Sequence, residues 1–291
     1  MAEISAKTVM QLRQMTGAGM MDCKKALVQA DGDIDAAVEI LRKSGIAKAA
    51  KKIDRESKEG RIEAAVSPDR KTGAMIMLSS ETDFVAKNEE FIELAKKLAE
   101  LALQNPVNST DELMNLNVDD LTVGDVITEL IAKIGENIKP KKITRFTAED
   151  NGIIYNYIHP GNKIGVMVEI ESDSPDVSQN EKVIELAKEI SMQIAFSKPV
   201  AISSDEVPKD VIEKEKKLYE EQAKEQGKPE KAIEKIVEGR LRKFLEESCL
   251  LNQEYIRDGD LTIEQLIKKV ADEISADIRI KNFARFEVGV S

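Results

Sequence analysis

The chain has 291 residues, of which 43 are basic and 54 acidic, so its formal net charge is −11. Aromatic residues make up 4% of the chain, which contains one histidine and two cysteines. This composition supports a folded core, and it excludes a disulfide framework, a histidine-rich metal site and a membrane-spanning run. The acidic balance argues against nucleic acid bound over a broad face. We expect a cytoplasmic protein with no signal peptide at its start.

Three short helices are predicted in the first fifty residues. Ser5 can cap the first helix, and Met20 to Gln29 forms the second after a glycine break. Asp33 or Asp35 can cap the third, for which Gly45 is the expected stop signal. Such a small module buries little surface, and we expect its exposed side to serve as a docking face.

A basic segment follows this module. Seven basic and two acidic residues lie between Arg42 and Lys58, so the segment carries a net charge of +5. A solvated linker or helix extension accounts for this charge. The alternative is a contact with an acidic partner surface or with RNA phosphate.

The middle of the chain has the pattern of an α+β fold that repeats. A strand hairpin followed by a long helix is predicted twice. The first set comprises 60–66, 74–78 and 88–104, and the second comprises 152–158, 164–170 and 181–196. We therefore expect two related subdomains, with the seam near Lys139 to Lys142.

The segment 205–247 is the most charged part of the chain. It contains 24 charged residues, 11 basic and 13 acidic, around a Gly227-Lys228-Pro229 turn. Thin apolar stripes on either side of the turn predict an antiparallel helical hairpin that protrudes into solvent or meets a partner. A helix over 261–274 and a strand over 278–288 are expected to close the fold.

Motifs for covalent chemistry are absent from the sequence. The glycines around Thr16 follow no strand and lack the third glycine of a dinucleotide loop, and no Gly-Lys-Ser/Thr phosphate loop occurs. The 54 acidic residues make any chosen acid–base pair arbitrary. His159 stands in a turn, where a structural or surface role and a partner contact are both open.

The segment from Ser80 to Asn88 joins a buried strand to a helix, a place where loops often carry function. It sets Phe84 beside Asp83 in a polar stretch. An aromatic ring held on a rigid corner makes a good anchor in a partner's pocket. Alternatively, Phe84 folds back onto the core while Asp83 or Asn88 caps the helix.

Several motifs together resemble one family. The run LRQMTGAGMMDCKKAL, from Leu12 to Leu27, resembles the N-terminal signature of elongation factor Ts, the exchange factor of the GTPase elongation factor Tu. TDFVAK (82–87) resembles the central motif of that family. KIGENI (133–138), HPGNKIGV (159–166), 190–199, the GKP turn with VEGRLRKF, and the closing RFEVG fit in the same order. The similarity covers essentially the whole chain.

The resemblance implies a specific function. Members of the family bind the GDP form of elongation factor Tu and speed nucleotide release without covalent catalysis, nucleotide binding or a cofactor of their own. The TDFV residues that would dislodge the partner's magnesium ion are Thr82, Asp83, Phe84 and Val85. The residues that would contact the partner are Leu12, Arg13 and Met20 in the helical module, and Ile134, Gly135 and His159 in the core.

The resemblance also implies a domain organisation. A ubiquitin-associated-like three-helix module with its basic linker occupies 1–55, and the first core subdomain 56–140. The second core subdomain comprises 141–204 and 248–291, with the helical hairpin inserted at 205–247. The chain departs from the family at Gln193, where a histidine is usual. Some members also continue past RFEVG, and we expect the contacts of such an extension to be missing.

Two alternative functions follow from the residues alone. One is a scaffold that joins other proteins through its helical module and hairpin. The other is an enzyme that uses carboxylates and a metal ion, which the lack of clustered ligands disfavours. The Asp83-Phe84 pair favours an exchange factor over a scaffold, because a scaffold has no need of it.

Overall fold

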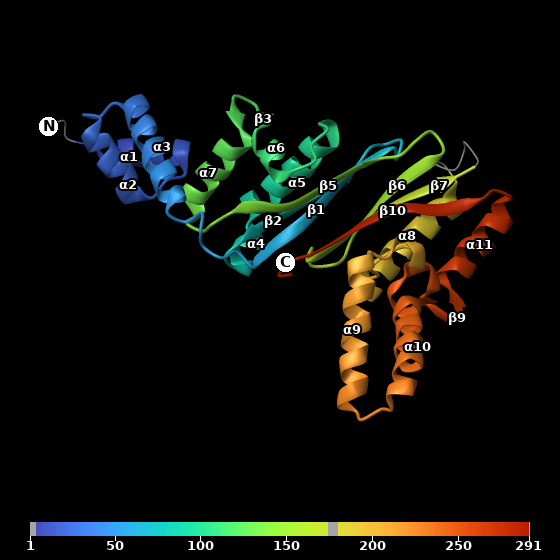
Figure 1. The fold of residues 1–291 in the computed structure, drawn as a ribbon. Coiled ribbons are helices and arrows are strands. Elements are labelled where there is room, and N and C mark those ends of the chain that lie inside the picture. Colours follow the sequence, from blue (N-terminus) through green and yellow to red (C-terminus); the bar gives the residue numbers. More distant parts are fainter. Residues whose placement is uncertain (1–3, 174–179, 291) are drawn as a thin grey trace.

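The computed structural model describes residues 4–173 and 180–290. A helical module lies at one end, followed by two antiparallel sheets, and a helical hairpin projects from the second sheet (Figure 1). The predicted α+β class is confirmed. None of the helices within the described residues is long and apolar enough to cross a membrane.

The helical module contains α1 (Ala6–Thr16), α2 (Met20–Gln29) and α3 (Ile34–Ala50). Ser5 and Asp33 cap α1 and α3 as expected, because each side chain accepts a hydrogen bond from a first-turn amide. The core of the module is formed by six buried side chains: Val9, Leu12, Cys23, Ala26, Leu27 and Ala37.

The prediction that Gly45 ends the third helix is wrong, because α3 continues to Ala50. A Cβ atom added at Gly45 would lie 3.0 Å from the Cβ atom of Ala132 on α7 (Val123–Ile134). Gly45 therefore allows close helix packing rather than a stop. Much of the basic segment is consequently the end of a helix that joins the module to the core.

The first sheet has the strand order β1-β2-β5, with β1 at Glu59–Val66, β2 at Thr72–Ser80 and β5 at Lys139–Thr147. The elements between β2 and β5 are α4 (Asp83–Ala86), α5 (Glu89–Gln104), α6 (Thr110–Met114), β3 (Asn117–Val118), β4 (Leu121–Thr122) and α7. The expected boundary after residue 140 falls inside β5, which pairs with β2 as far as Thr147.

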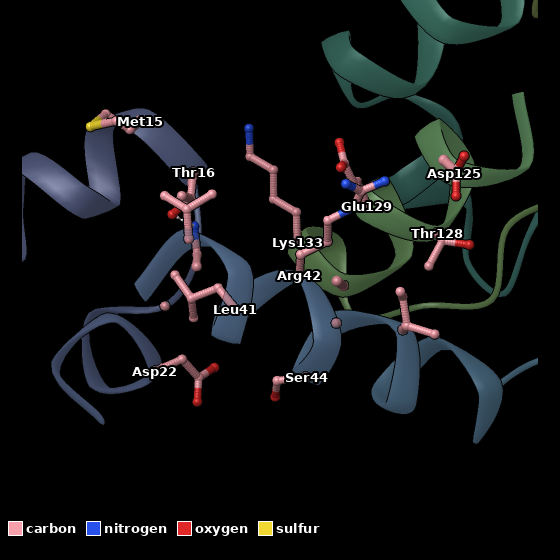
Figure 2. A pocket seen from close by; sticks show the side chains of 16 residues that line it. Met15, Thr16, Asp22, Leu41, Arg42, Ser44, Asp125, Thr128, Glu129 and Lys133 are labelled. Atoms are coloured by element: carbon pink, nitrogen blue, oxygen red, sulfur yellow. Dashed lines mark hydrogen bonds between the residues drawn. The ribbon is translucent and has the colours of Figure 1, made fainter. Parts of the chain in front are cut away.

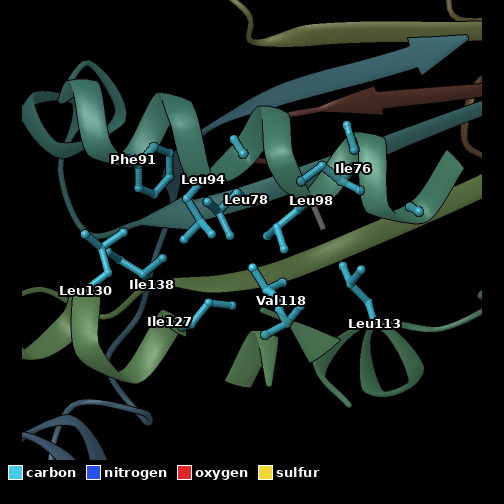
Figure 3. Packing of buried hydrophobic residues seen from close by; sticks show 14 of the residues in the cluster. Ile76, Leu78, Phe91, Leu94, Leu98, Leu113, Val118, Ile127, Leu130 and Ile138 are labelled. Carbon is cyan, nitrogen blue, oxygen red and sulfur yellow. The ribbon is translucent and has the colours of Figure 1, made fainter. Parts of the chain in front are cut away.

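Buried side chains of α5 and α7 cover one face of this sheet. Phe91, Leu94 and Leu98 recur along α5 at helical spacing and face Ile76 and Leu78 of β2 (Figure 3). This packing fixes both ends of the segment between β2 and α5, which contains α4.

The second sheet has the order β10-β7-β6, with β6 at Gly152–Ile158, β7 at Ile164–Ser172 and β10 at Ile278–Glu287. Its other elements are α8 (Glu181–Ser197), β8 (Glu254–Tyr255), β9 (Asp258–Thr262) and α11 (Ile263–Ile274). Short 3₁₀ turns lie at Ser204–Glu206 and Leu250–Asn252.

The predicted helical hairpin consists of α9 (Lys209–Glu225) and α10 (Glu230–Ser248), inserted between α8 and β8. It extends away from the sheets in Figure 1. Only Ala223, Ile233 and Val237 form its buried seam among the described residues. This thin contact matches the narrow apolar stripes in the sequence.

The two halves of the core repeat each other in detail. Asn88 caps α5 and Asn180 caps α8, each through a side-chain oxygen that accepts a first-turn amide. Thr122 and Thr262 form capping boxes at the starts of α7 and α11. The predicted repeat of hairpin and helix therefore extends to the following helix and the closing strand.

The two sheets meet through equivalent close contacts. A Cβ atom at Gly73 would lie 2.5 Å from Cγ2 of Ile154, and one at Gly165 would lie 2.5 Å from Cγ2 of Ile62. The amide of Ile62 donates to the carbonyl of Asn162 at 2.8 Å, and the amide of Ile154 donates to the carbonyl of Arg70 at 2.7 Å. The halves thus pack with approximate twofold symmetry.

We expect Gly165→Ala to destabilise the protein by about 1–3 kcal/mol, the usual cost of overpacking a core. The new methyl group would collide with Ile62 and the sulfur of Met75. Urea unfolding followed by circular dichroism measures the change in the free energy of unfolding.

Gly239→Ala is the matched control, because Gly239 lies inside α10 with open space around the added methyl group. Alanine has a higher helix propensity than glycine, so this variant should gain about 0.5–1 kcal/mol. Equal stability of the two variants would contradict tight packing between the sheets.

Candidate functional site

The TDFV residues form a short corner between β2 and α5. Thr82 is the N-cap of α4, and its hydroxyl oxygen accepts a hydrogen bond from the amide of Val85 at 3.4 Å. The side chain of Val85 is buried in the core of the first half. The corner is therefore attached at both its first and its last TDFV residue.

Phe84 points away from the core, and its exposed fraction is 81%. The alternative in which this ring folds back onto the core is thus excluded. Asn88 does cap α5, as that alternative proposed. An exposed large aromatic side chain on a fixed corner is available to another molecule.

Asp83 carries a charge next to this ring. Lys87 Nζ lies 2.7 Å from Asp83 Oδ2, and this hydrogen bond lowers the pKa of Asp83 and raises the pKa of Lys87. The charge of Lys163 lowers the pKa of Asp83 further. Asp83 is therefore a carboxylate at neutral pH.

The KIGENI segment supports the corner from behind. Glu136 accepts two hydrogen bonds from Thr82, one from the hydroxyl at 2.7 Å and one from the amide at 2.9 Å. The amide of Asn137 donates to the carboxylate of Glu81 at 2.7 Å. Sequence reasoning assigned Ile134 and Gly135 in this segment but missed Glu136. Glu136 is part of the KIGENI motif, but only the fold reveals its contact with Thr82.

Ile134 and Gly135 lie at the end of α7, close to the corner. Ile134 is half-buried against the core of the first half, and Gly135 caps α7 with a φ of 94°. The carbonyl oxygen of Gly135 accepts a hydrogen bond from Lys52 Nζ at 2.5 Å. The basic segment thus contacts the KIGENI segment, which also forms hydrogen bonds with Thr82 of the corner.

The turn that contains His159 is joined to the corner through β1. Asn162 donates from its side chain to Glu63 at 3.2 Å, Glu63 pairs with Arg61 at 2.5 Å, and Arg61 contacts the carbonyl oxygen of Ala86 at 3.5 Å. This chain of contacts connects the second half of the core to the end of α4.

His159 itself is exposed, and its Nδ1 lies 2.9 Å from the hydroxyl of Tyr157. Its amide donates to the carbonyl of Ile164 within the turn. The imidazole is therefore oriented by the second sheet and remains accessible.

The three module residues differ in accessibility. Arg13 is exposed in the last turn of α1, and Met20 is 42% exposed at the start of α2. Leu12 is 0% exposed, so its side chain packs inside the module and offers no surface to a partner. Leu12 thus belongs to the core that joins α1 to α2 and α3.

A pocket of about 270 Å³ is lined by residues of the module and of α7, next to the place where α3 packs on α7 (Figure 2). Arg42 on α3 and Lys133 on α7 line it together with Asp22 and Glu129. Lys133 also pairs with Glu90 at 2.7 Å. The module and the corner are thus separate surfaces connected by α3 and α7.

Gln193, at the histidine position of the family pattern, is buried. Its side-chain nitrogen donates to the carbonyl of Glu254 at 3.1 Å, and its oxygen accepts the amide of Ile256 at 2.9 Å. These bonds connect α8 to the β8–β9 turn. Gln193 therefore has a structural role within the second half.

Side chains that could bind a metal ion are dispersed over the described residues. Across residues 4–173 and 180–290, no group of three or more histidine, cysteine or acidic side chains is arranged to hold a metal ion. Both cysteines are buried with free thiols. The geometry offers instead an exposed ring, a carboxylate and a rigid support, which suit contact with another protein.

Comparison with known proteins shows the family to which the chain belongs. A family model described as "Elongation factor TS" matches residues 81–290, which include the corner, the KIGENI segment and the HPGN turn. The chain belongs to the elongation factor Ts family.

Curated relatives match over nearly their full length. An elongation factor Ts of Clostridium botulinum (strain Eklund 17B / Type B) is 47% identical over 287 residues, which cover 98% of this chain and 93% of the relative. One of Clostridium perfringens (strain SM101 / Type A) is 46% identical over 289 residues, with the same coverage of both chains. Membership of the elongation factor Ts family therefore applies to the whole chain, including the helical module.

The hydrogen bonds of Asn137, in the KIGENI segment behind the corner, lead to a stability prediction for Asn137→Ala. The buried side chain of Asn137 donates to the carbonyls of Ile53 at 3.1 Å and Arg55 at 2.7 Å. Its removal leaves these carbonyls unpaired, so we expect a loss of about 1–3 kcal/mol. Thermal unfolding measures the stability, and tryptic cleavage near Arg55 should become faster.

Asn282→Ala serves as the control, because Asn282 is exposed on β10. This variant should unfold and be cleaved like the wild type. Unchanged cleavage near Arg55 in Asn137→Ala would contradict the role of Asn137 in fixing the basic segment.

Proposed function

We propose that the chain is a guanine-nucleotide exchange factor that binds the GDP form of elongation factor Tu and promotes GDP release. Family membership supports the partner and the type of activity. The single observation that supports the mechanism is Phe84, exposed on a fixed corner beside the ionised Asp83.

The corner acts on the partner's magnesium site in this proposal. Phe84 inserts near the ion and Asp83 brings a negative charge, while Thr82 and Val85 hold the corner rigid. Loss of magnesium removes the charge that holds the β-phosphate, so the affinity for GDP falls. By thermodynamic reciprocity, GDP weakens the binding of the factor to the same extent.

The remaining contacts give affinity and orientation. Arg13 and Met20 dock the module on the GTPase, with Leu12 supporting them from the core, while Ile134-Gly135 and His159 add contacts around the corner. No covalent step occurs on this chain, so we classify it as a binding factor rather than an enzyme.

We propose cytoplasmic action without a cofactor, a membrane or nucleic acid. The working units are the module with its linker (1–55), the two core subdomains (56–140, and 141–204 with 248–291) and the hairpin (205–247).

Removal of the exposed ring tests the proposal most directly. We expect Phe84→Ala to lower the maximum rate of stimulated GDP release by at least about tenfold, because aromatic anchors contribute about 2 kcal/mol or more at interfaces. Release of a fluorescent GDP analogue from elongation factor Tu measures this rate. Circular dichroism should remain unchanged, since the ring makes little contact with the core.

Leu218→Ala removes another exposed apolar side chain, on α9 of the hairpin, and serves as the control. It should stimulate release like the wild type. If wild type and Phe84→Ala stimulate release equally, the assigned role of the corner is wrong, and the scaffold alternative gains support.

Magnesium displacement leads to a separate prediction. When EDTA removes magnesium beforehand, we expect GDP release from elongation factor Tu to be fast in buffer alone, so the stimulation factor of the wild type should shrink. The same release assay, with and without the chelator, measures both factors. An equal stimulation factor in the two conditions would show that the corner acts by another route.

A further inference from the structure

We propose that Glu136 is a positioning residue for exchange, which holds the corner so that Phe84 and Asp83 project toward the partner. This inference rests on the function proposed above and assigns a role that the exposed residues alone do not explain. Glu136 does not reach the partner's magnesium site in this view, since it acts through Thr82.

The contact between Glu136 and Thr82 has the geometry of a clamp. One carboxylate oxygen accepts the Thr82 hydroxyl at 2.7 Å and the other accepts the Thr82 amide at 2.9 Å. Two bonds from one carboxylate to one residue fix both its backbone and its side chain. Hydrogen bonds to an ionised acceptor are also stronger than neutral ones.

The corner needs such a clamp because α4 cannot hold its own shape. It has four residues, and isolated helices of this length are unstable in water. Phe84 contributes little packing because its ring is 81% exposed. The direction of the ring therefore depends on the Thr82 cap at one end and on buried Val85 at the other.

The second half of the core contains the hydrogen bond next to this clamp. The amide of Asp277 donates to Asp173 at 2.8 Å, just as the amide of Asn137 donates to Glu81 at 2.7 Å. Both pairs follow a helix that ends in a left-handed residue, Gly135 or Ser275.

The residue after this left-handed cap differs between the halves. It is Glu136 in the first half and Ala276, which has no carboxylate, in the second. The hydrogen bond from the next residue, Asn137 or Asp277, is common to both halves. At the position directly after the cap, the carboxylate is present only in the half that carries the exposed ring, as a role in holding that ring requires.

The test compares Glu136→Ala with two other variants in the fluorescent-GDP release assay on elongation factor Tu. Glu136→Ala should lower the maximum stimulated rate about tenfold while the half-saturating concentration changes less than about threefold, because the docking residues of the module are intact. Glu136→Gln retains an oxygen for the Thr82 amide and should stay within about threefold of wild type.

Gln265→Ala is the matched control for the loss of a cap. Gln265 accepts the amide of Thr262 at 2.9 Å in the capping box of α11, away from the corner. The melting temperature of Gln265→Ala should fall at least as far as that of Glu136→Ala. The rate of GDP release that Gln265→Ala stimulates should nevertheless match that of the wild type.

A double-mutant cycle with Phe84→Ala then shows whether Glu136 acts through the ring. If it does, adding Glu136→Ala to Phe84→Ala should slow release less than about twofold, because coupled residues are not additive. Multiplicative losses would overturn the inference. So would a wild-type rate in Glu136→Ala, or an equal loss of rate in Glu136→Ala and Gln265→Ala.

The proposed function fails separately from this inference. If the wild-type protein does not accelerate GDP release, exchange activity is refuted and the positioning role falls with it. If the wild type accelerates release and Glu136→Ala does so equally well, only the positioning role is refuted.

Discussion

The close approach of the two sheets at Gly73 and Gly165 is the constraint on which the rest of the structure depends. Without side chains at these positions, isoleucine side chains of the opposite sheet fill the space, and the backbones exchange equivalent hydrogen bonds. This contact brings the HPGN turn of the second half against β1 of the first. The surface around Phe84 is therefore assembled from both halves, and neither half alone presents all of it.

Much of the fold could be predicted from the sequence because local signals agree with it. Helical spacing of apolar residues marked α5, and Ser5 marked the start of α1. Gly45 misled the prediction, since a glycine that ends a helix and a glycine that admits a neighbouring helix look the same in sequence. Only the position of Ala132 on α7 distinguishes the two cases.

The candidate site was predictable in part for a similar reason. The residues from Thr82 to Val85 are adjacent in sequence, so their place at a strand-to-helix corner could be inferred from the neighbouring elements. Glu136 lies 54 residues beyond Thr82, and its contact depends on how α7 and β5 return to the first sheet. The burial of Leu12 likewise depends on the packing of three helices, which a motif alone does not specify.

The continuity of α3 has a consequence for the entropy of binding. A flexible linker would let the module and the core search for their contacts independently, and each would lose freedom on binding. Here one helix of 17 residues, about 25 Å long, runs from the module to its packing site on α7. Lys52 then joins the following turn to Gly135. Much of the orientational entropy is therefore lost during folding, so a partner that engages the module finds the corner already held at a defined distance.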